Sequence, residues 1–298
     1  MSQSLQDFSN GLAMVVADAG ASVARVEGRR RGPASGIIWT ADGLIVTANH
    51  VIHRDDNLRV GLPDGQTADA TLVGRDPTTD LALLKVDASG LKAVDPVADE
   101  EMAVGHFVLA LGRPGRTVQA TSGIISAFGE GWRTPMGGQV DHYLQTDVVM
   151  YPGFSGGPLV GAAGRILGLN TSGLGQGVSL TIPAGTVARV VDSLKAHGRV
   201  RRGYLGVSTQ RVRLPKDAAG ALGQKSGLLV ISVEPGSPAA EAGMGPGDTI
   251  VMLGGRSISR HEDLLGALSG DAVGQKEVAV ILRGGHTQEL TVKIGERE

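Results

Sequence analysis

The sequence of 298 residues contains no cysteine. Disulfide bonds and thiolate metal sites are therefore excluded. The seven histidines are scattered, and the closest pair, His50 and His53, lacks the HExxH arrangement of a helical zinc site. We therefore expect a protein without a bound metal or other cofactor.

Aromatic residues are scarce, with two tryptophans, three tyrosines and four phenylalanines in the whole chain. Hydrophobic residues still make up 41%, so the cores are expected to consist mainly of valine, leucine, isoleucine and alanine. The formal net charge is only -2, which gives no overall field that would attract nucleic acid or an anionic membrane. The short basic runs Arg29–Arg31 and Arg199–Arg202 are expected to be solvated loops, and we predict no nucleic-acid partner.

The N-terminus lacks the features of an export signal or a membrane anchor. Met1–Phe8 has no basic region, and the apolar run Gly11–Val16 is followed closely by Asp18, which makes it too short to span a bilayer. The sequence as it stands predicts a cytoplasmic protein, or an extracytoplasmic one if a leader has been removed. Ser2–Ala19 is expected to form a short helix or arm, or else a frayed terminus.

The stretch Tyr151–Leu159 places a serine between glycines in an apolar neighbourhood. Glycines let the backbone turn sharply and let a substrate approach closely, which suits an activated hydroxyl nucleophile. Ser155 is the candidate nucleophile, and the backbone N–H groups of Gly153 and Ser155 are candidates for an oxyanion hole. A GxSxG string alone is weak evidence in a chain with 46 glycines, so the serine needs partners elsewhere.

Two partners occur upstream, each beside an expected buried strand. Leu44–Thr47 leads to His50, the candidate base, and Asp80 precedes the apolar run Leu81–Val86 and is the candidate residue that orients the base. The chain order of histidine, aspartate and Ser155 is that of chymotrypsin-like two-barrel proteases and differs from the subtilisin and α/β-hydrolase orders.

Two other acids are alternatives to Asp80. Asp76 lies in the same turn, and Asp147 lies close before the candidate nucleophile. The Gln145-Thr146-Asp147 context favours a structural role for the latter.

Four motifs resemble those of the HtrA (Deg) family of serine proteases: Thr47–Ile52, Thr79–Val86, Gly153–Leu159 and Gly203–Val207. The resemblance extends from about Val23 to the C-terminus. It implies a mostly β protein, with a chymotrypsin-like double β-barrel followed by a small α+β PDZ domain. It also implies an endopeptidase that acts on unfolded polypeptides, binds C-terminal peptides at the PDZ domain and forms a homo-oligomer such as a trimer.

The chain departs from the family pattern in two places. Family members usually carry asparagine where this chain has Phe154, and a Gly-Phe-Ala-Ile-Pro-like segment where it has Ser179–Pro183. The first departure concerns the resting shape of the oxyanion loop, and the second alters a wall near the specificity pocket.

We expect residues 1–198 to form the protease domain with an N-terminal arm, 199–203 a linker and 204–298 the PDZ domain. Short apolar runs separated by Gly, Pro and Asp turns predict the strands of two barrels. The expected strands of the first barrel are residues 23–26, 35–40, 44–47, 58–62, 68–76 and 81–86. Those of the second are residues 106–111, 117–126, 143–146, 157–160, 166–171 and 178–182. A helix that includes Val187–Leu194 and stops at Gly198 is expected to close the protease domain.

The last hundred residues predict strands at 228–233 and 249–253 and a final hairpin. Ser237 is expected to cap a short helix, and Ser259 with Glu262 to form the capping box of a second helix through Leu268. This region resembles a PDZ domain of the permuted bacterial type. The resemblance implies that a loop binds the C-terminal carboxylate of a peptide. The residues of this loop are Tyr204, Leu205, Gly206 and Val207. The alternative is a small structural α+β domain without a ligand.

Substrate preference is predicted from residues near the nucleophile. Val149, Met150, Asn170 and Leu180 are the candidates for the specificity pocket, and no acid is placed to bind lysine or arginine. We therefore predict cleavage after small or medium aliphatic residues. The alternative function is a peptide-binding chaperone or scaffold with a silent protease domain. A phosphate loop at Gly173–Gly177 is disfavoured because no P-loop lysine follows it.

Overall fold

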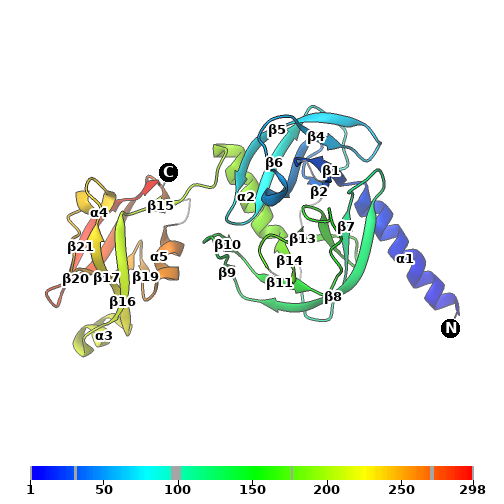
Figure 1. Cartoon of the computed structure of the whole chain (residues 1–298). Coiled ribbons are helices and arrows are strands. Elements are labelled where there is room, and N and C mark those ends of the chain that lie inside the picture. Colours follow the sequence, from blue (N-terminus) through cyan, green and yellow to red (C-terminus); the bar gives the residue numbers. More distant parts are fainter. Residues whose placement is uncertain (1, 30–31, 95–101, 176, 269–271, 297–298) are drawn as a thin grey trace. The chain divides into compact units, whose positions relative to one another are not determined.

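The computed structural model describes the whole chain except residues 1, 30–31, 95–101, 176, 269–271 and 297–298. The chain folds into two compact units, Met1–Val200 and Arg201–Glu298 (Figure 1). The first unit holds two closed barrels, and the second is built on an open six-stranded sheet with a small two-stranded sheet of β15 (Gly203–Tyr204) and β22 (Gly295–Glu296) beside it in the chain.

Six antiparallel strands close the first barrel in the order β1-β2-β3-β6-β5-β4. They are β1 (Val23–Glu27), β2 (Ala34–Ile38), β3 (Leu44–Ala48), β4 (Leu58–Gly61), β5 (Thr67–Asp76) and β6 (Leu81–Val86). All six predicted strands are present. In the pairing of β3 with β6, Ala48 lies opposite Leu81. The residues just after β3 and just before β6 are therefore neighbours in space.

The second barrel follows the order β11-β14-β13-β12-β7-β8. Its strands are β7 (Phe107–Gly112), β8 (Gln119–Gly129), β11 (Tyr143–Thr146), β12 (Pro158–Gly161), β13 (Ile166–Thr171) and β14 (Ser179–Pro183). The two barrels confirm the predicted fold class. Pro158 of β12 lies opposite Leu169 of β13, so the loop before β12 runs beside the end of β13.

The main core of the first unit runs through both barrels, and among the described residues its buried members are valine, leucine, isoleucine and alanine alone. This composition is the one expected from the shortage of aromatic residues. Helix α2 (Ala184–His197) packs against β5 and β13. It ends at Gly198, which has a φ of 69° and donates its N–H to the carbonyl of Leu194, as the sequence predicts.

The N-terminal segment forms helix α1 (Ser2–Gly20), so it is a helix and not a frayed terminus. Leu12, Val15 and Val16 pack against the core, and the Phe8 ring contacts Phe107 edge-on with a centroid distance of 6.0 Å. Within the described residues, no helix combines the length and the apolar character needed to cross a membrane. A small hairpin of β9 (Trp132–Arg133) and β10 (Gln139–Val140) was not predicted, because two-residue strands leave no alternating pattern.

The second unit is built on a sheet with the path β16-β17-β18-β20-β21. Its strands are β15 (Gly203–Tyr204), β16 (Val207–Arg213), β17 (Ser226–Val233), β18 (Thr249–Leu253), β19 (Arg256–Ser257), β20 (Lys276–Arg283), β21 (His286–Lys293) and β22 (Gly295–Glu296). Its helices are α3 (Lys216–Leu222), α4 (Pro238–Glu241) and α5 (His261–Ala267). Strand β16 and helix α3 were not predicted. The strand lies at a sheet edge and is largely polar, which hides the apolar alternation.

The two predicted caps of this unit had different outcomes. Ser237 caps α4 through a hydrogen bond from the N–H of Ala240, which confirms the prediction. The capping box of Ser259 and Glu262 was wrong. The carboxylate of Asp263 instead accepts the N–H groups of Ser259 and Arg260, at 2.8 and 3.0 Å, so the helix begins at His261.

An ion pair joins the buried Asp248, just before β18, to the partly exposed Arg283 at the end of β20. Asp248 accepts two hydrogen bonds from the Arg283 guanidinium and one from the N–H of Gly245, each 2.7 Å long. Burial opposes ionisation of the carboxyl, but these hydrogen bonds more than offset it and hold the pKa of Asp248 below its ordinary value of 3.8. The resulting stabilisation is complete above pH 3.8 and is lost as the pH falls through the lowered pKa.

We expect Asp248→Asn to weaken amide protection in β18 and β20 at neutral pH, with the difference from wild type shrinking below about pH 4. Hydrogen exchange of the full chain, expressed as protection factors at each pH, measures this. The exposed Asp217→Asn is the matched control and should change little. A mutant difference that stays constant to the lowest pH would show that the carboxylate charge is not the stabilising element.

Candidate active site

The loop before β12 carries Ser155 on a backbone that only glycine permits. Gly153 and Gly156 have φ values of 94° and 88°, a region that residues with a Cβ rarely adopt. A Cβ on Gly156 would lie 2.1 Å from the carbonyl oxygen of Ser35. The glycines on which the sequence prediction depended are therefore required by both conformation and space.

The peptide units of this loop are fixed by backbone hydrogen bonds. The N–H of Phe154 donates to the carbonyl of Tyr151, and the carbonyl of Phe154 accepts the N–H of Gly157, at 3.0 and 2.9 Å. Within the described part of the chain, the N–H groups of Gly153 and Ser155 donate to no protein acceptor. The loop thus presents two N–H donors on either side of Phe154, the pair proposed from the sequence.

Phe154, the departure from the family pattern, is fully buried. Its ring lies edge-on to Tyr151 with a centroid distance of 5.8 Å. It also fills the space beside Gly112, where a Cβ would approach its ring within 2.7 Å. The side chain is therefore an anchor of the loop in the second-barrel core and faces away from solvent.

His50 lies in the short 3-10 turn Asn49–Val51 that follows β3, and Asp80 immediately precedes β6. The Asp80 carboxylate accepts the His50 backbone N–H through Oδ1 and lies 2.8 Å from Nδ1 through Oδ2. The hydroxyl of Thr171 also donates to Oδ2. Asp80 is buried and has a φ of 59°, which is uncommon for a residue other than glycine. The strand pairing therefore brings the predicted base and acid together.

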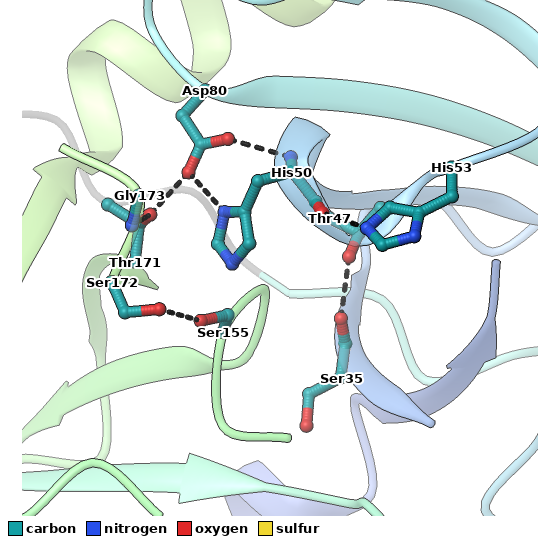
Figure 2. Close-up of polar contacts among 9 residues, drawn as sticks. All are labelled: Ser35, Thr47, His50, His53, Asp80, Ser155, Thr171, Ser172 and Gly173. Carbon is teal, nitrogen blue, oxygen red and sulfur yellow. Dashed lines mark hydrogen bonds and ion pairs between the residues drawn. The ribbon is translucent and has the colours of Figure 1, made fainter. Parts of the chain in front are cut away.

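Figure 2 shows the imidazole of His50 lying between Asp80 and Ser155. The Ser155 hydroxyl is hydrogen-bonded to the hydroxyl of Ser172, with an Oγ–Oγ distance of 3.0 Å. In this state the hydroxyl of the nucleophile candidate is engaged by Ser172, and either hydroxyl can be the donor of this hydrogen bond.

We expect Ser172→Ala to increase the rate at which a fluorophosphonate modifies Ser155 by about fivefold, because a typical hydrogen bond contributes about 1 kcal/mol. Stopped-flow labelling with a fluorescent fluorophosphonate measures this rate. Ser172 is exposed, so the change leaves no buried cavity. Ser126→Ala removes an exposed hydroxyl of β8 in the same barrel and serves as the control. A slower reaction of Ser172→Ala would indicate that Ser172 assists Ser155.

The two alternative acids have other partners. The carboxylate of Asp76 accepts hydrogen bonds from the N–H and hydroxyl of Thr78 and from the hydroxyl of Thr79. The carboxylate of Asp147 accepts the N–H of Ile124 in β8 at 2.6 Å. The structural role expected for Asp147 agrees with this contact.

The candidate pocket residues differ in their surroundings. Val149 is exposed and Met150 is partly buried, whereas Leu180 and Asn170 are buried. The Asn170 amide donates to a carbonyl of β12 and accepts from a threonine hydroxyl of β14, at 2.8 and 3.0 Å. Its polar atoms are therefore engaged within the barrel, and a pocket formed by these residues remains a prediction.

The Tyr204–Val207 loop stands at the start of edge strand β16. Gly206 has a φ of 77°, and a Cβ there would collide with Ser237. The carbonyls of Leu205 and Gly206 accept N–H groups of their own unit at 2.9 and 2.8 Å. The loop is thus held from its carbonyl side, and its role as a carboxylate site also remains a prediction.

Three hydroxyl residues at the site were not assigned from the sequence: Ser35, Thr171 and Ser172. Thr171 and Ser35 are fully buried, and buried polar groups in proteins almost always have a partner. A hydroxyl at the end or start of an otherwise apolar strand was the available signal, but it does not identify the partner.

The comparisons with known proteins agree with both units. Residues 34–169 match the family described as trypsin-like peptidase domain, and residues 203–294 match the PDZ domain family. The solved structure of HtrA-type protease AlgW with a decapeptide is similar with a TM-score of 0.79 and 32% identity, covering 96% of this chain and 98% of that one. The chain belongs to the HtrA family of serine proteases.

Other HtrA relatives support this assignment. The serine endoprotease from Yersinia pestis has a TM-score of 0.78 and 30% identity, over 96% of this chain and 98% of that one. A probable periplasmic serine endoprotease DegP-like of Hahella chejuensis is 38% identical over 280 residues, and one of Ectopseudomonas mendocina is 39% identical over 269 residues. These alignments cover 90% and 88% of this chain, and the chain spans 59% and 56% of those two relatives.

Proposed function

We propose that this HtrA chain is a serine endopeptidase that hydrolyses peptide bonds through an acyl-enzyme. The observation that carries the proposal is the His50–Asp80 pair beside a serine whose loop offers two N–H donors without a protein acceptor. Asp80, fixed by three hydrogen bonds, holds the imidazole in the tautomer with hydrogen on Nδ1, which leaves Nε2 able to accept a proton.

The reaction then follows from these positions. Nε2 of His50 takes the proton of Ser155 as Oγ attacks the scissile carbonyl carbon, and the carbonyl oxygen becomes an oxyanion. The N–H groups of Gly153 and Ser155 stabilise this oxyanion. His50 gives its proton to the leaving amine, and a water molecule hydrolyses the acyl-enzyme by the same steps.

The proposed substrates are unfolded polypeptides, cleaved after small or medium aliphatic residues. Val149 and Met150 supply apolar surface, the buried Leu180 is apolar as well, and no acid stands among these three residues to bind a basic side chain. Mass spectrometry of the products of unfolded casein tests the preference. Efficient cleavage only after lysine or arginine would contradict it.

The PDZ unit is proposed to bind C-terminal peptides and to regulate the protease. Strand β16 is an edge strand of its sheet, so a peptide could add beside it as a further strand. Nε2 of His261, the first residue of α5, lies 3.0 Å from the carbonyl oxygen of Thr209 in β16, a contact that an added strand would exchange. The glycine-rich segments Phe128–Asp141 and Thr171–Gly177 are the proposed responding loops.

Location and assembly complete the proposal. The relatives are described as periplasmic, which supports the extracytoplasmic alternative over the cytoplasmic one. A homo-oligomer is proposed with α1 as its contact element, because Leu5, Phe8 and Met14 of this helix are exposed apolar side chains.

The decisive experiment combines covalent labelling with hydrolysis of unfolded casein, with and without a hydrophobic C-terminal peptide. We expect a fluorophosphonate adduct on Ser155, located by peptide mass spectrometry, and casein hydrolysis that stops when the adduct forms. Peptide stimulation would support the regulatory role of the PDZ unit. Peptide binding with neither labelling nor hydrolysis would instead favour the chaperone or scaffold alternative.

A further inference from the structure

Ser35 connects the first barrel to the loop of Ser155. It lies in β2 and its side chain is fully buried. Its backbone N–H donates to the carbonyl of Ser155 at 3.1 Å, and its hydroxyl donates to the carbonyl of Gly153 at 2.7 Å. The same hydroxyl accepts the backbone N–H of Arg113 at 2.7 Å. One hydroxyl is thus used both as donor and as acceptor at the centre of the site.

The hydrogen bond to Gly153 completes the restraint on one peptide unit. The carbonyl of Gly153 and the N–H of Phe154 belong to the same planar unit. The first is held by Ser35 and the second by the carbonyl of Tyr151. Gly153 can rotate about φ and ψ at little cost. The direction of the Gly153 N–H therefore depends on what holds the peptide unit between Gly153 and Phe154. Without the Ser35 hydroxyl, one end of it would be released.

Arg113 holds the other side of Ser35. Its side chain is buried, and its guanidinium donates to the carbonyls of Val23, Gly20 and Arg116 at 2.6, 2.8 and 2.9 Å. Burial lowers the pKa of this guanidinium, but each of its three nitrogens donates to a carbonyl. Since these acceptors fix the whole residue, its backbone N–H stays directed at the Ser35 hydroxyl. The contacts form a continuous path from the end of α1 to Gly153.

We propose that Ser35 is the positioning residue of the oxyanion hole and that Arg113 holds Ser35 in its working rotamer. The inference rests on the proposed peptidase function and assigns Ser35 no contact with the substrate. Its role is to keep the N–H of Gly153 directed at the oxyanion that forms on attack by Ser155. Such a residue acts on the transition state and leaves ground-state binding unchanged.

The test compares Ser35→Ala with Thr47→Val in the full chain. The Thr47 hydroxyl is also buried and donates to the backbone carbonyl of Ser35 (Figure 2), so its loss removes one buried hydrogen bond between β2 and β3 without touching Gly153. Removal of an oxyanion donor costs 10²–10³ in kcat, and we expect the loosened donor of Ser35→Ala to cost about 10- to 100-fold. KM should stay within about twofold, and Thr47→Val should keep both parameters within about twofold.

A transition-state analogue separates positioning from general damage. A peptide aldehyde that forms a hemiacetal with Ser155 places its oxyanion in the hole, so its affinity should fall by the same factor as kcat in Ser35→Ala. Circular dichroism and thermal unfolding verify that each variant folds. Arg113→Lys leaves Ser35 in place but loses the planar fork, and we expect a fall in kcat of about fivefold. It provides the second test if Ser35→Ala does not fold.

The outcomes separate this inference from the proposed function. If the wild type is active and Ser35→Ala has the same kcat, the role of Ser35 is overturned and the peptidase function stays intact. If Ser35→Ala does not fold, an unchanged kcat in Arg113→Lys has the same meaning. A rise in KM that accounts for the whole loss would also overturn the role of Ser35. A wild type that neither reacts with the fluorophosphonate nor hydrolyses casein would overturn the function and this inference together.

Discussion

Ser155→Ala is expected to lower kcat for a casein-derived peptide by about 10⁶-fold, since loss of a triad nucleophile in a serine protease has about this effect. Alanine has no oxygen that could attack the carbonyl carbon, so the acyl-enzyme cannot form. What remains is the slower attack of water, assisted by the N–H groups of Gly153 and the mutated residue. Single-turnover kinetics with a fluorogenic peptide can measure both the main effect and this remainder.

The variant should still bind substrate, because the hydroxyl of Ser155 contributes little to ground-state affinity. Fluorescence anisotropy of the labelled peptide is expected to give a Kd close to the wild-type KM where chemistry limits turnover. Ser126→Ala is the matched control, since it removes an exposed hydroxyl of β8 in the same barrel and should leave kcat nearly unchanged. Retained casein hydrolysis in Ser155→Ala would show that another residue, or a contaminating protease, carries the activity.

The triad candidates could be predicted from the sequence because each stands at the edge of a pattern that is visible there. His50 follows a buried run, Asp80 precedes another, and Ser155 lies between glycines. The antiparallel pairing of β3 with β6 then brings the first two together. Local sequence could not give the φ of 59° at Asp80, because an aspartate before an apolar run rarely adopts this conformation.

The residues that position the triad could not be predicted in this way. Ser35 and Gly153 are 118 positions apart, and a serine in an apolar strand gives no indication of which loop it contacts. Ser172 follows a buried strand as many surface serines do. The Ser35 contact arises only when the two barrels are brought together, and the Ser172 contact only when β12 and β13 pair within the second barrel. Both depend on the tertiary structure and not on local patterns.

The fold shows the same division between local and tertiary information. The sequence predicts twelve barrel strands from short apolar runs, and the structure contains all twelve of these strands. Strand β16 escaped prediction because an edge strand exposes many of its side chains and therefore tolerates polar residues. The start of α5 was misplaced because Asp263, one residue after Glu262, reaches back to both N–H groups.

Asp80→Asn should lower kcat by about 10⁴-fold, the effect of this change in the serine protease triad. The asparagine would present either its NH₂ group or its carbonyl oxygen to Nδ1 of His50. In either orientation the NH₂ group would face a donor that the carboxylate now accepts, the backbone N–H of His50 or the hydroxyl of Thr171. An NH₂ group facing Nδ1 selects the tautomer with hydrogen on Nε2. That nitrogen could no longer accept the proton of Ser155, so the nucleophile would lose its base while the fold stayed intact.

Asp76→Asn is the matched variant, because it makes the same chemical change in the same turn. Asp76 accepts three hydrogen bonds from Thr78 and Thr79, so the change should lower the free energy of unfolding by about 1–3 kcal/mol. It should leave kcat within a few-fold, because the orientation of His50 comes from Asp80. Measuring kcat and thermal unfolding for both variants separates the two roles. A large loss of kcat in Asp76→Asn, with Asp80→Asn active, would identify Asp76 as the acid. Only the acid that fixes the tautomer of His50 can lower kcat without a matching loss in the free energy of unfolding.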